Sequence, residues 1–175
     1  MNVVIIGNGI TGITAARNIR KISDNRITVI SAESKHFYSR TALMYVYMGH
    51  MKYEDIKPYE DWFWEKNRID ILQDYVQNID IKNKKLNLAS GITVIYDKLI
   101  IASGSKSNKF GWPGQDLGGV QGLYSLQDLQ LLEQNTKKIQ RAVIVGGGLQ
   151  FPEPETSVTP REIKSFSIIR VGPEP

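Results

Sequence analysis

The sequence predicts an α/β fold built on a parallel β-sheet, and three features of its first 30 residues point to it. Residues 3–6 are a β-branched run that a glycine ends at once. Such runs are typical of strands buried on both faces of a parallel sheet. A helical pattern over residues 10–22 and a second apolar run at residues 26–30 follow. Strand, helix and strand in so short a span predict a βαβ unit with a right-handed crossover.

The middle of the chain is predicted to hold an irregular insertion and a set of short strands. Residues 34–53 mix aromatic and polar side chains without clean periodicity, which indicates an insertion facing a ligand. Residues 55–66 fit a short helix with Pro58 in its first turn. Four short apolar segments separated by polar turns then predict a small antiparallel meander: residues 69–72, 79–81, 86–88 and 92–96.

The second half of the chain begins with the same strand pattern and then loses it. Residues 99–102 are again a buried strand, residues 126–138 form an amphipathic helix, and residues 142–145 are a strand ended by glycines. After residue 150 several prolines stand where that strand calls for a helix. Residues 167–171 fit one short strand. A frameshift or a premature end would produce such a loss of pattern.

Composition excludes several classes of function. The 41% hydrophobic and 23% charged residues are typical of a globular protein, and the net charge of +4 is scattered, so no nucleic-acid partner is expected. The absence of cysteine excludes thiolate nucleophiles, disulfides and iron–sulfur clusters, so any redox chemistry must belong to a cofactor. His36 and His50 lack the spacing of metal ligands. No apolar run is long enough for a membrane span or secretory segment, and the cytoplasm is the expected location.

Residues 7–12 read Gly-Asn-Gly-Ile-Thr-Gly, a G-x-G-x-x-G motif directly after a buried strand and at the start of a helix. In that context the glycines allow a tight turn, the approach of a pyrophosphate to the backbone, and close packing of helix on strand. The N–H groups at the helix start then bind the phosphates. Glu33 follows the second strand, where an acidic side chain accepts hydrogen bonds from an adenosine ribose. The sequence therefore predicts a Rossmann-like dinucleotide site, for FAD or for NAD.

Two later segments resemble a known family and favour FAD. Residues 96–105, and the renewed strand and glycines at residues 143–148, together with the first motif, resemble the two-dinucleotide flavoproteins of the pyridine nucleotide-disulphide oxidoreductase family. The resemblance covers residues 1 to about 149 and implies FAD at the first motif and NAD(P)H at the second. Residues 37–43 are most similar to the corresponding segment of nitrite reductase large subunits, rubredoxin reductases and NADH oxidases.

The resemblance also implies which residues hold the cofactors. Arg40 and Thr41 would lie against the flavin and its phosphates, and Val76 beside the adenine. A guanidinium is a natural counter-charge for a diphosphate, and a free surface position for Arg40 stays open as the alternative. The residues predicted to bind cofactor are Gly7, Asn8, Gly9, Ile10, Thr11, Gly12, Glu33, Ser34, Arg40, Thr41, Val76, Ala102, Ser103, Gly104, Gly146 and Gly148. No catalytic residue is assigned.

Three departures from the family pattern bear on activity. The chain lacks the redox cysteine of the NADH oxidases, which excludes peroxide reduction through a sulfenic acid. Phe151 stands where the second motif needs its third small residue, and Pro152 and Pro154 interrupt the following helix. We therefore expect the isolated chain to reduce flavin with NADH slowly or not at all. The late strand that closes the family's FAD domain is also missing from the sequence.

The predicted organisation is an incomplete FAD-binding domain at residues 1–110, a linker and connecting helix at 111–141, the start of an NAD(P)-binding domain at 142–150, and a divergent tail at 151–175. The predicted function is the FAD-binding part of an NAD(P)H-dependent flavin oxidoreductase, passing hydride from nicotinamide to flavin and on to an unnamed electron acceptor. Two alternatives stay open. In the first, the chain is a non-catalytic dinucleotide-binding module or remnant, and in the second it is one half of a split flavoenzyme completed by another chain.

A missing last strand would leave one edge of the strand at residues 99–102 without main-chain partners. Three candidates could cover this edge: the segment 167–171, a second copy of the chain, or a complementary polypeptide. Because that segment is short and flanked by proline and glycine, we favour pairing between molecules.

Overall fold

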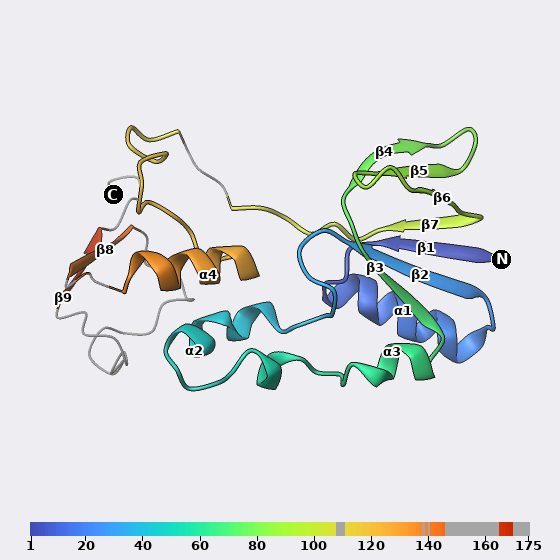
Figure 1. Cartoon of the computed structure of the whole chain (residues 1–175), viewed down its shortest axis with the longest axis horizontal. Coiled ribbons are helices and arrows are strands. Elements are labelled where there is room, and N and C mark those ends of the chain that lie inside the picture. The colour runs from blue at the N-terminus through green and yellow to red at the C-terminus, as the bar shows by residue number, and fades with distance from the viewer. Residues whose placement is uncertain (108–110, 138, 140, 146–164, 170–175) are drawn as a thin grey trace, which may run out of the picture. The chain divides into compact units, whose positions relative to one another are not determined.

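The computed structural model describes residues 1–107, 111–137, 139, 141–145 and 165–169 (Figure 1). The chain divides into two compact units. The first unit comprises Met1–Arg40 and Glu54–Asn108, and the second comprises Thr41–Tyr53 and Lys109–Pro175. The glycine-rich motif therefore belongs to the first unit.

The first unit is built on a four-stranded parallel sheet with the strand order β3-β2-β1-β7. The strands are β1 (Asn2–Ile6), β2 (Arg26–Ser31), β3 (Ile69–Gln73) and β7 (Lys98–Ile101). Helix α1 (Ile10–Ile22) connects β1 to β2, as the βαβ pattern predicts. In register, Ile5 of β1 lies opposite Val29 of β2 and Ile100 of β7. The predicted α/β fold with its parallel sheet is confirmed.

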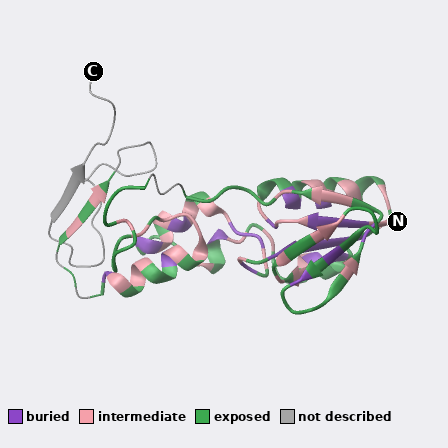
Figure 2. Cartoon of the chain, turned by 90° about the horizontal axis from the view of Figure 1, so that it is seen from above, coloured by how far each residue is buried: buried purple, intermediate pink, exposed green. Residues whose placement is uncertain are grey.

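Two layers cover the two faces of this sheet. Helices α1 and α3 (Trp62–Lys66) lie on one face, where Ile5 packs with Ile13 and Trp64. The antiparallel sheet of β4 (Val76–Asp80), β5 (Lys85–Leu88) and β6 (Thr93–Ile95) lies on the other face (Figure 1). There Val4, the neighbour of Ile5, packs with Leu86. Successive residues of a strand point to opposite faces, so β1 contributes to both cores. The buried residues concentrate in this unit's strands (Figure 2).

One predicted strand belongs to a different sheet. We expected residues 69–72 in the antiparallel meander, but β3 pairs in parallel with β2, with Ile69 opposite Ile27. The reason is the short helix α3, which carries the chain across the helical face, so that Ile69 and Ile71 join the core around Trp64. The antiparallel sheet consists of the other three predicted segments, in the order β4-β5-β6.

The helix predicted at residues 55–66 is also corrected. This stretch contains a 3₁₀ turn, η2 (Glu54–Ile56), and the separate five-residue helix α3. Pro58 lies between them, and it cannot donate the main-chain hydrogen bond that a continuous helix would require. Aromatic packing holds the segment instead: the rings of Tyr59 and Phe63 stack with 4.4 Å between centroids.

Arg20 closes the sheet at the edge where the strands begin. Its guanidinium donates from Nε to the carbonyl of Asn67 (2.8 Å) and from Nη1 to that of Ser23 (3.1 Å). Nη2 donates to the carbonyls of Asn25 and Arg68, each at 2.7 Å. One side chain thus ties together the end of α1, the approach to β2 and the turn before β3.

The described part of the second unit contains two short helices and a pair of strands. Helix α2 (Leu43–Tyr47), preceded by the 3₁₀ turn η1 (Arg40–Ala42), packs against α4 (Leu126–Asn135). A capping box begins α4: Ser125 Oγ accepts from the N–H of Asp128 (3.1 Å), whose carboxylate accepts from the N–H of Ser125 (2.8 Å). Such reciprocal capping fixes the first turn of a helix.

The strand predicted at residues 167–171 is β9 (Ser165–Ile169), and it pairs in parallel with β8 (Arg141–Val145). The alternative in which this segment covers the outer edge of β7 is therefore wrong. No strand among the described residues pairs with that edge. Pairing between molecules stays a prediction. In the described part of the chain, no helix is long and apolar enough to cross a membrane.

Candidate functional site

The turn between β1 and α1 depends on two glycines for its own packing. Gly7 has φ +104°, and a Cβ there would lie 2.1 Å from the carbonyl oxygen of Ala102. A Cβ on Gly12 would lie 2.0 Å from the carbonyl oxygen of Gly7. Both obstacles are backbone atoms, which cannot rotate away. The N–H of Gly7 also donates to the carbonyl of Ile30 at 2.7 Å, which continues the ladder between β1 and β2. These glycines let helix, turn and strands approach closely.

Gly9 differs from the other two glycines of the motif. Its φ of −70° suits any residue, and a Cβ there would meet no atom of the described residues within 4 Å. Nothing in the fold therefore requires a glycine at this position. Gly9 is the N-cap of α1, no side chain caps the helix, and its first turn carries no acidic residue. The start of α1 thus keeps its N–H groups and an open space suited to an anion.

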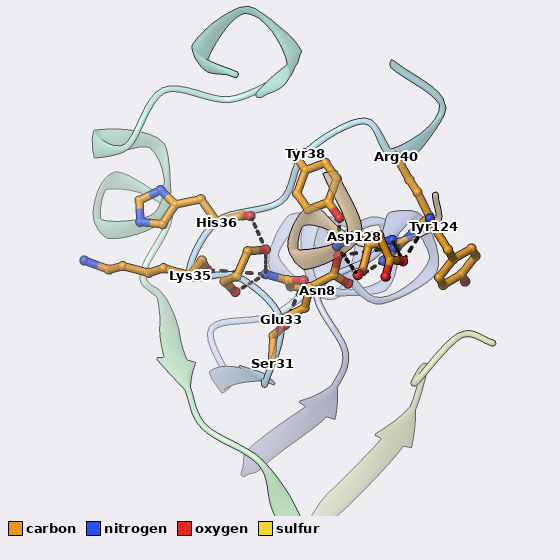
Figure 3. Close-up of polar contacts among 11 residues, drawn as sticks. Asn8, Ser31, Glu33, Lys35, His36, Tyr38, Arg40, Tyr124 and Asp128 are labelled. Carbon is orange, nitrogen blue, oxygen red and sulfur yellow. Dashed lines mark hydrogen bonds and ion pairs between the residues drawn. The ribbon is translucent and has the colours of Figure 1, made fainter. Parts of the chain in front are cut away.

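Asn8 does not direct its side chain to solvent, because it is buried with Ser31 and Ser34. Its amide nitrogen donates to the carbonyl of Ser34 at 2.8 Å, and its amide oxygen accepts from the hydroxyl of Ser31 at 3.0 Å (Figure 3). Only the main chain of Asn8 is left to take part in a ligand site. The side chain joins the glycine turn to the loop after β2.

Glu33 and Arg40, predicted separately from the sequence, form an ion pair. The Glu33 carboxylate accepts from Arg40 Nη1 at 3.2 Å and from Nη2 at 2.5 Å (Figure 3). It also accepts a hydrogen bond from the hydroxyl of Tyr38. The central carbon of the Arg40 guanidinium lies 5.7 Å from the centroid of the Tyr38 ring. The two charged residues and the tyrosine form one cluster, with Glu33 and Arg40 partly exposed.

Sequence reasoning missed Tyr38 and Ser31. Tyr38 stands two residues before Arg40, in a stretch without periodicity, so only this i, i+2 spacing could have suggested that the two side chains share a face. Ser31 is a polar residue at the carboxyl end of an apolar strand. Because open α/β sheets bind ligands at that edge, its position could have identified it as a candidate site residue.

The segment after β7 lies beside the glycine turn. The N–H of Ala102 donates to the carbonyl of Ile6 at 2.8 Å, and its own carbonyl faces Gly7. Ser103 and Gly104 follow and are exposed, with Gly104 at φ +70°. The structure therefore brings the ends of β1, β2 and β7 together with the start of α1. This is the carboxyl edge of the sheet, where open α/β sheets bind their ligands.

The structure does not place the other four predicted residues in this group. Val76 lies in β4 and packs against the core with Leu72. Thr41 is exposed and belongs to the second unit. Gly146 and Gly148 lie outside the described residues.

A second polar cluster lies where the loop after β2 meets α3. The Nδ1 atom of His36 lies 2.7 Å from the Asp61 carboxylate, and the Lys57 ammonium lies 3.1 Å from it. The hydrogen bond from Lys57, with the positive charges nearby, holds the pKa of Asp61 below its ordinary value. His36 also contacts the Trp64 ring edge-on, with 6.3 Å between centroids. Across the described part of the chain, no group of three or more His, Asp or Glu side chains could hold a metal ion.

Comparison with known proteins identifies the family. Residues 1–150 match the family model described as pyridine nucleotide-disulphide oxidoreductase. The chain belongs to the pyridine nucleotide-disulphide oxidoreductase family. Members of this family use FAD and NAD(P)H, and the predicted resemblance is confirmed.

One related member is the biphenyl dioxygenase system ferredoxin-NAD(+) reductase component of Paraburkholderia xenovorans (strain LB400). It is 31% identical to this chain over 174 residues, which are 98% of this chain and 42% of the relative. The crystal structure of NADH:rubredoxin oxidoreductase from Clostridium acetobutylicum matches with a TM-score of 0.75 at 34% identity, covering 84% of this chain and 38% of that one. A ferredoxin reductase from Rhodopseudomonas palustris gives 0.77 at 26% identity, covering 85% and 37%. The chain spans about two-fifths of these family members.

Proposed function

We propose that this chain binds the adenosine diphosphate half of FAD at the carboxyl edge of its parallel sheet. The observation that carries the proposal is Gly9. The protein's own backbone and packing account for Gly7 and Gly12, but they leave the glycine at position 9 without a structural reason. A ligand that comes close to the main chain at the start of α1 supplies that reason.

The surrounding residues fit such a ligand. The uncapped first turn of α1 offers N–H groups and the positive end of the helix dipole to a diphosphate. Glu33 follows the adjacent strand, where its carboxylate can accept hydrogen bonds from ribose hydroxyls. Arg40, paired with Glu33, brings a positive charge to the same edge. When bound, FAD supplies the capacity to accept a hydride from NAD(P)H and to release electrons to an acceptor.

We further infer that the chain supplies the FAD-binding part of an NAD(P)H-dependent flavin oxidoreductase of the cytoplasm. The names of its relatives suggest a carrier protein such as ferredoxin or rubredoxin as the acceptor. Mixing the FAD-loaded chain with NADH under anaerobic conditions separates an active reductase from a binding module. Rapid, saturable bleaching of the flavin would establish the hydride step in this chain and contradict the inactivity expected from Pro152 and Pro154.

The binding proposal is tested by Gly9→Ser. Serine is a better N-cap than glycine, so the substitution should leave the melting temperature unchanged or raise it. Its side chain would occupy the open space at the start of α1, so FAD affinity, measured by titration calorimetry, should fall at least about tenfold. Gly118→Ser is the matched control, because a Cβ at Gly118 also meets nothing within 4 Å. Equal FAD affinity in Gly9→Ser and the unmodified chain would refute the proposal.

A further inference from the structure

Three buried polar side chains lie between the glycine turn and the loop after β2. Asn8 is 7% exposed, Ser31 is 7% exposed and Ser34 is 4% exposed. Burying polar groups is unfavourable unless each finds a hydrogen-bond partner, and apolar side chains would fill such a space at lower cost. The arrangement of these three residues therefore calls for an explanation beyond packing.

The hydrogen bonds among them have a fixed direction. The carbonyl of Ser34 can only accept, so it must face the amide nitrogen of Asn8, which lies 2.8 Å away and also 3.4 Å from the carbonyl of Lys35. The amide oxygen of Asn8 then faces Ser31, whose hydroxyl donates to it at 3.0 Å. The Ser34 hydroxyl continues the chain of bonds to the carbonyl of His36 at 2.9 Å. A single planar amide thus holds the loop at two points.

Glu33 lies between these two points in the sequence. Ser31 precedes it by two residues and Ser34 follows it directly, so the main chain that carries Glu33 is anchored on both sides by Asn8 (Figure 3). Asn8 itself lies between Gly7 and Gly9, in the turn that leads into α1. Its side chain therefore fixes the distance between the start of α1 and the Glu33 carboxylate.

Pairing of the strands does not depend on this link. The N–H of Gly7 already donates to the carbonyl of Ile30, which joins the ends of β1 and β2. The Asn8 amide acts farther out, on the side chain of Ser31 at the end of β2 and on the main chain of Ser34 in the loop that follows. Only a side chain with a donor and an acceptor in one plane can make both bonds, which aspartate, alanine and leucine cannot.

We propose that Asn8 is a positioning residue that holds Glu33 at the spacing needed for one ligand to contact both the start of α1 and the carboxylate. The inference rests on the proposed function, in which these two groups receive the diphosphate and the ribose of the same nucleotide. Its consequence is specific. Loss of the Asn8 amide should weaken recognition of the ribose hydroxyls more than it weakens binding of the diphosphate.

The experiment compares ADP with 2′-deoxy-ADP by titration calorimetry on the full chain. The unmodified chain should prefer ADP about tenfold, as expected for a hydrogen bond to a charged group. Asn8→Ala should reduce this preference to about twofold or less, and Ser31→Ala, which removes one of the two anchors, should reduce it partly. Glu33→Ala should abolish the preference, and combining it with Asn8→Ala should add nothing further.

Asn67→Ala is the matched control. Asn67 also donates from its side-chain amide to a main-chain carbonyl, that of Phe63 at 2.7 Å, but it lies at the opposite edge of the sheet. This variant should lose stability and keep the full preference for ADP. A purely structural role for Asn8 predicts the same behaviour for Asn8→Ala.

The outcomes separate the inference from the function on which it rests. If Asn8→Ala weakens both nucleotides equally and the ratio stays near tenfold, the inference is wrong and the binding site stands. Should Asn8→Ala fail to fold, an unchanged ratio in Ser31→Ala overturns the inference equally. Failure of the unmodified chain to bind ADP and FAD, or an unchanged ratio in Glu33→Ala, refutes the proposed site and with it this inference.

Discussion

The polar groups differ between the two edges of the parallel sheet that lie across its strand ends. At the edge where the strands begin, the Arg20 guanidinium donates to four main-chain carbonyls, so that edge is completed by the protein itself. At the edge where the strands end, α1 begins without a side-chain cap beside the open space at Gly9. The same strands therefore begin at a closed edge that serves stability and end at an open edge, where we propose that the ligand binds. Substitutions at the two edges should have separable effects.

The largest effect, on thermal stability, is expected at the open edge where α1 packs closely on β1. Gly12→Val places a branched side chain against the carbonyl of Gly7, where even a Cβ would lie at 2.0 Å. Because the obstacle is backbone, α1 cannot keep its place on β1, and we expect loss of cooperative thermal unfolding monitored by circular dichroism. Gly118→Val is the control and should melt like the unmodified chain. Native melting of Gly12→Val would mean that the close packing of helix on strand is not required.

Arg20→Ala tests the closed edge. Removing four hydrogen bonds from a charged donor should lower the free energy of unfolding by about 2–4 kcal/mol, measured by urea denaturation. Arg20→Lys, which keeps the charge and loses the planar fork, should recover only part of this loss. FAD affinity of the folded fraction should not change in either variant. A large loss of affinity would show that the two edges are coupled.

Tyr38→Phe is a smaller change at the open edge. It removes the hydroxyl that donates to Glu33 and keeps the ring beneath the Arg40 guanidinium. We expect FAD affinity to fall about threefold to tenfold, because the Glu33 carboxylate stays in place but loses one of the hydrogen bonds that orient it. Tyr96→Phe, at a buried tyrosine in the core beneath the antiparallel sheet, should bind FAD normally. Equal FAD affinities for the two variants would show that the Tyr38 hydroxyl takes no part in the site.

The smallest effect concerns a turn outside both edges. Asp80 accepts from the side chain of Asn83 at 2.7 Å and from its N–H at 3.0 Å, and these bonds hold the pKa of Asp80 below its ordinary value of 3.8. A carboxyl whose pKa is lowered on folding stabilises the protein above its unfolded pKa and loses that contribution as the pH falls through the folded value. Asp80→Ala should therefore be slightly less stable at pH 7 and equal to the unmodified chain in strong acid. A difference that grows on acidification would contradict this reasoning.

Local patterns explain which parts of the fold the sequence could predict. The first strand, helix α1 and the glycine motif form one continuous segment with a strong signal, and the structure has them as expected. The partner of β3 could not be found in this way, because β2 lies far away in the sequence and the two helices between them, α2 and α3, have only five residues each. Pro58 is compatible both with the first turn of a helix and with a break, and residue type alone does not distinguish the two.

The candidate site likewise has parts that the sequence predicted and parts that it could not predict. The spacing of the motif predicted the roles of Gly7 and Gly12 and the place of Glu33. The pairing of Glu33 with Arg40 and the burial of the Asn8 amide depend on how the loop after β2 folds back, and that loop has no periodicity from which to infer it. Side-chain contacts across an irregular loop are set by tertiary packing rather than by residue type.

The contact between Gly7 and Ala102 has a consequence for the order of folding. The glycine motif lies at the start of the chain, but its turn is shaped against a carbonyl that follows β7, the last strand of the sheet in sequence. Closing so long a loop carries an entropic cost that local contacts cannot offset beforehand. During synthesis the motif therefore leaves the ribosome well before its partner exists. The glycine turn reaches its native form only when β7 docks, so a nascent chain stopped before that strand should carry the whole motif without the native turn.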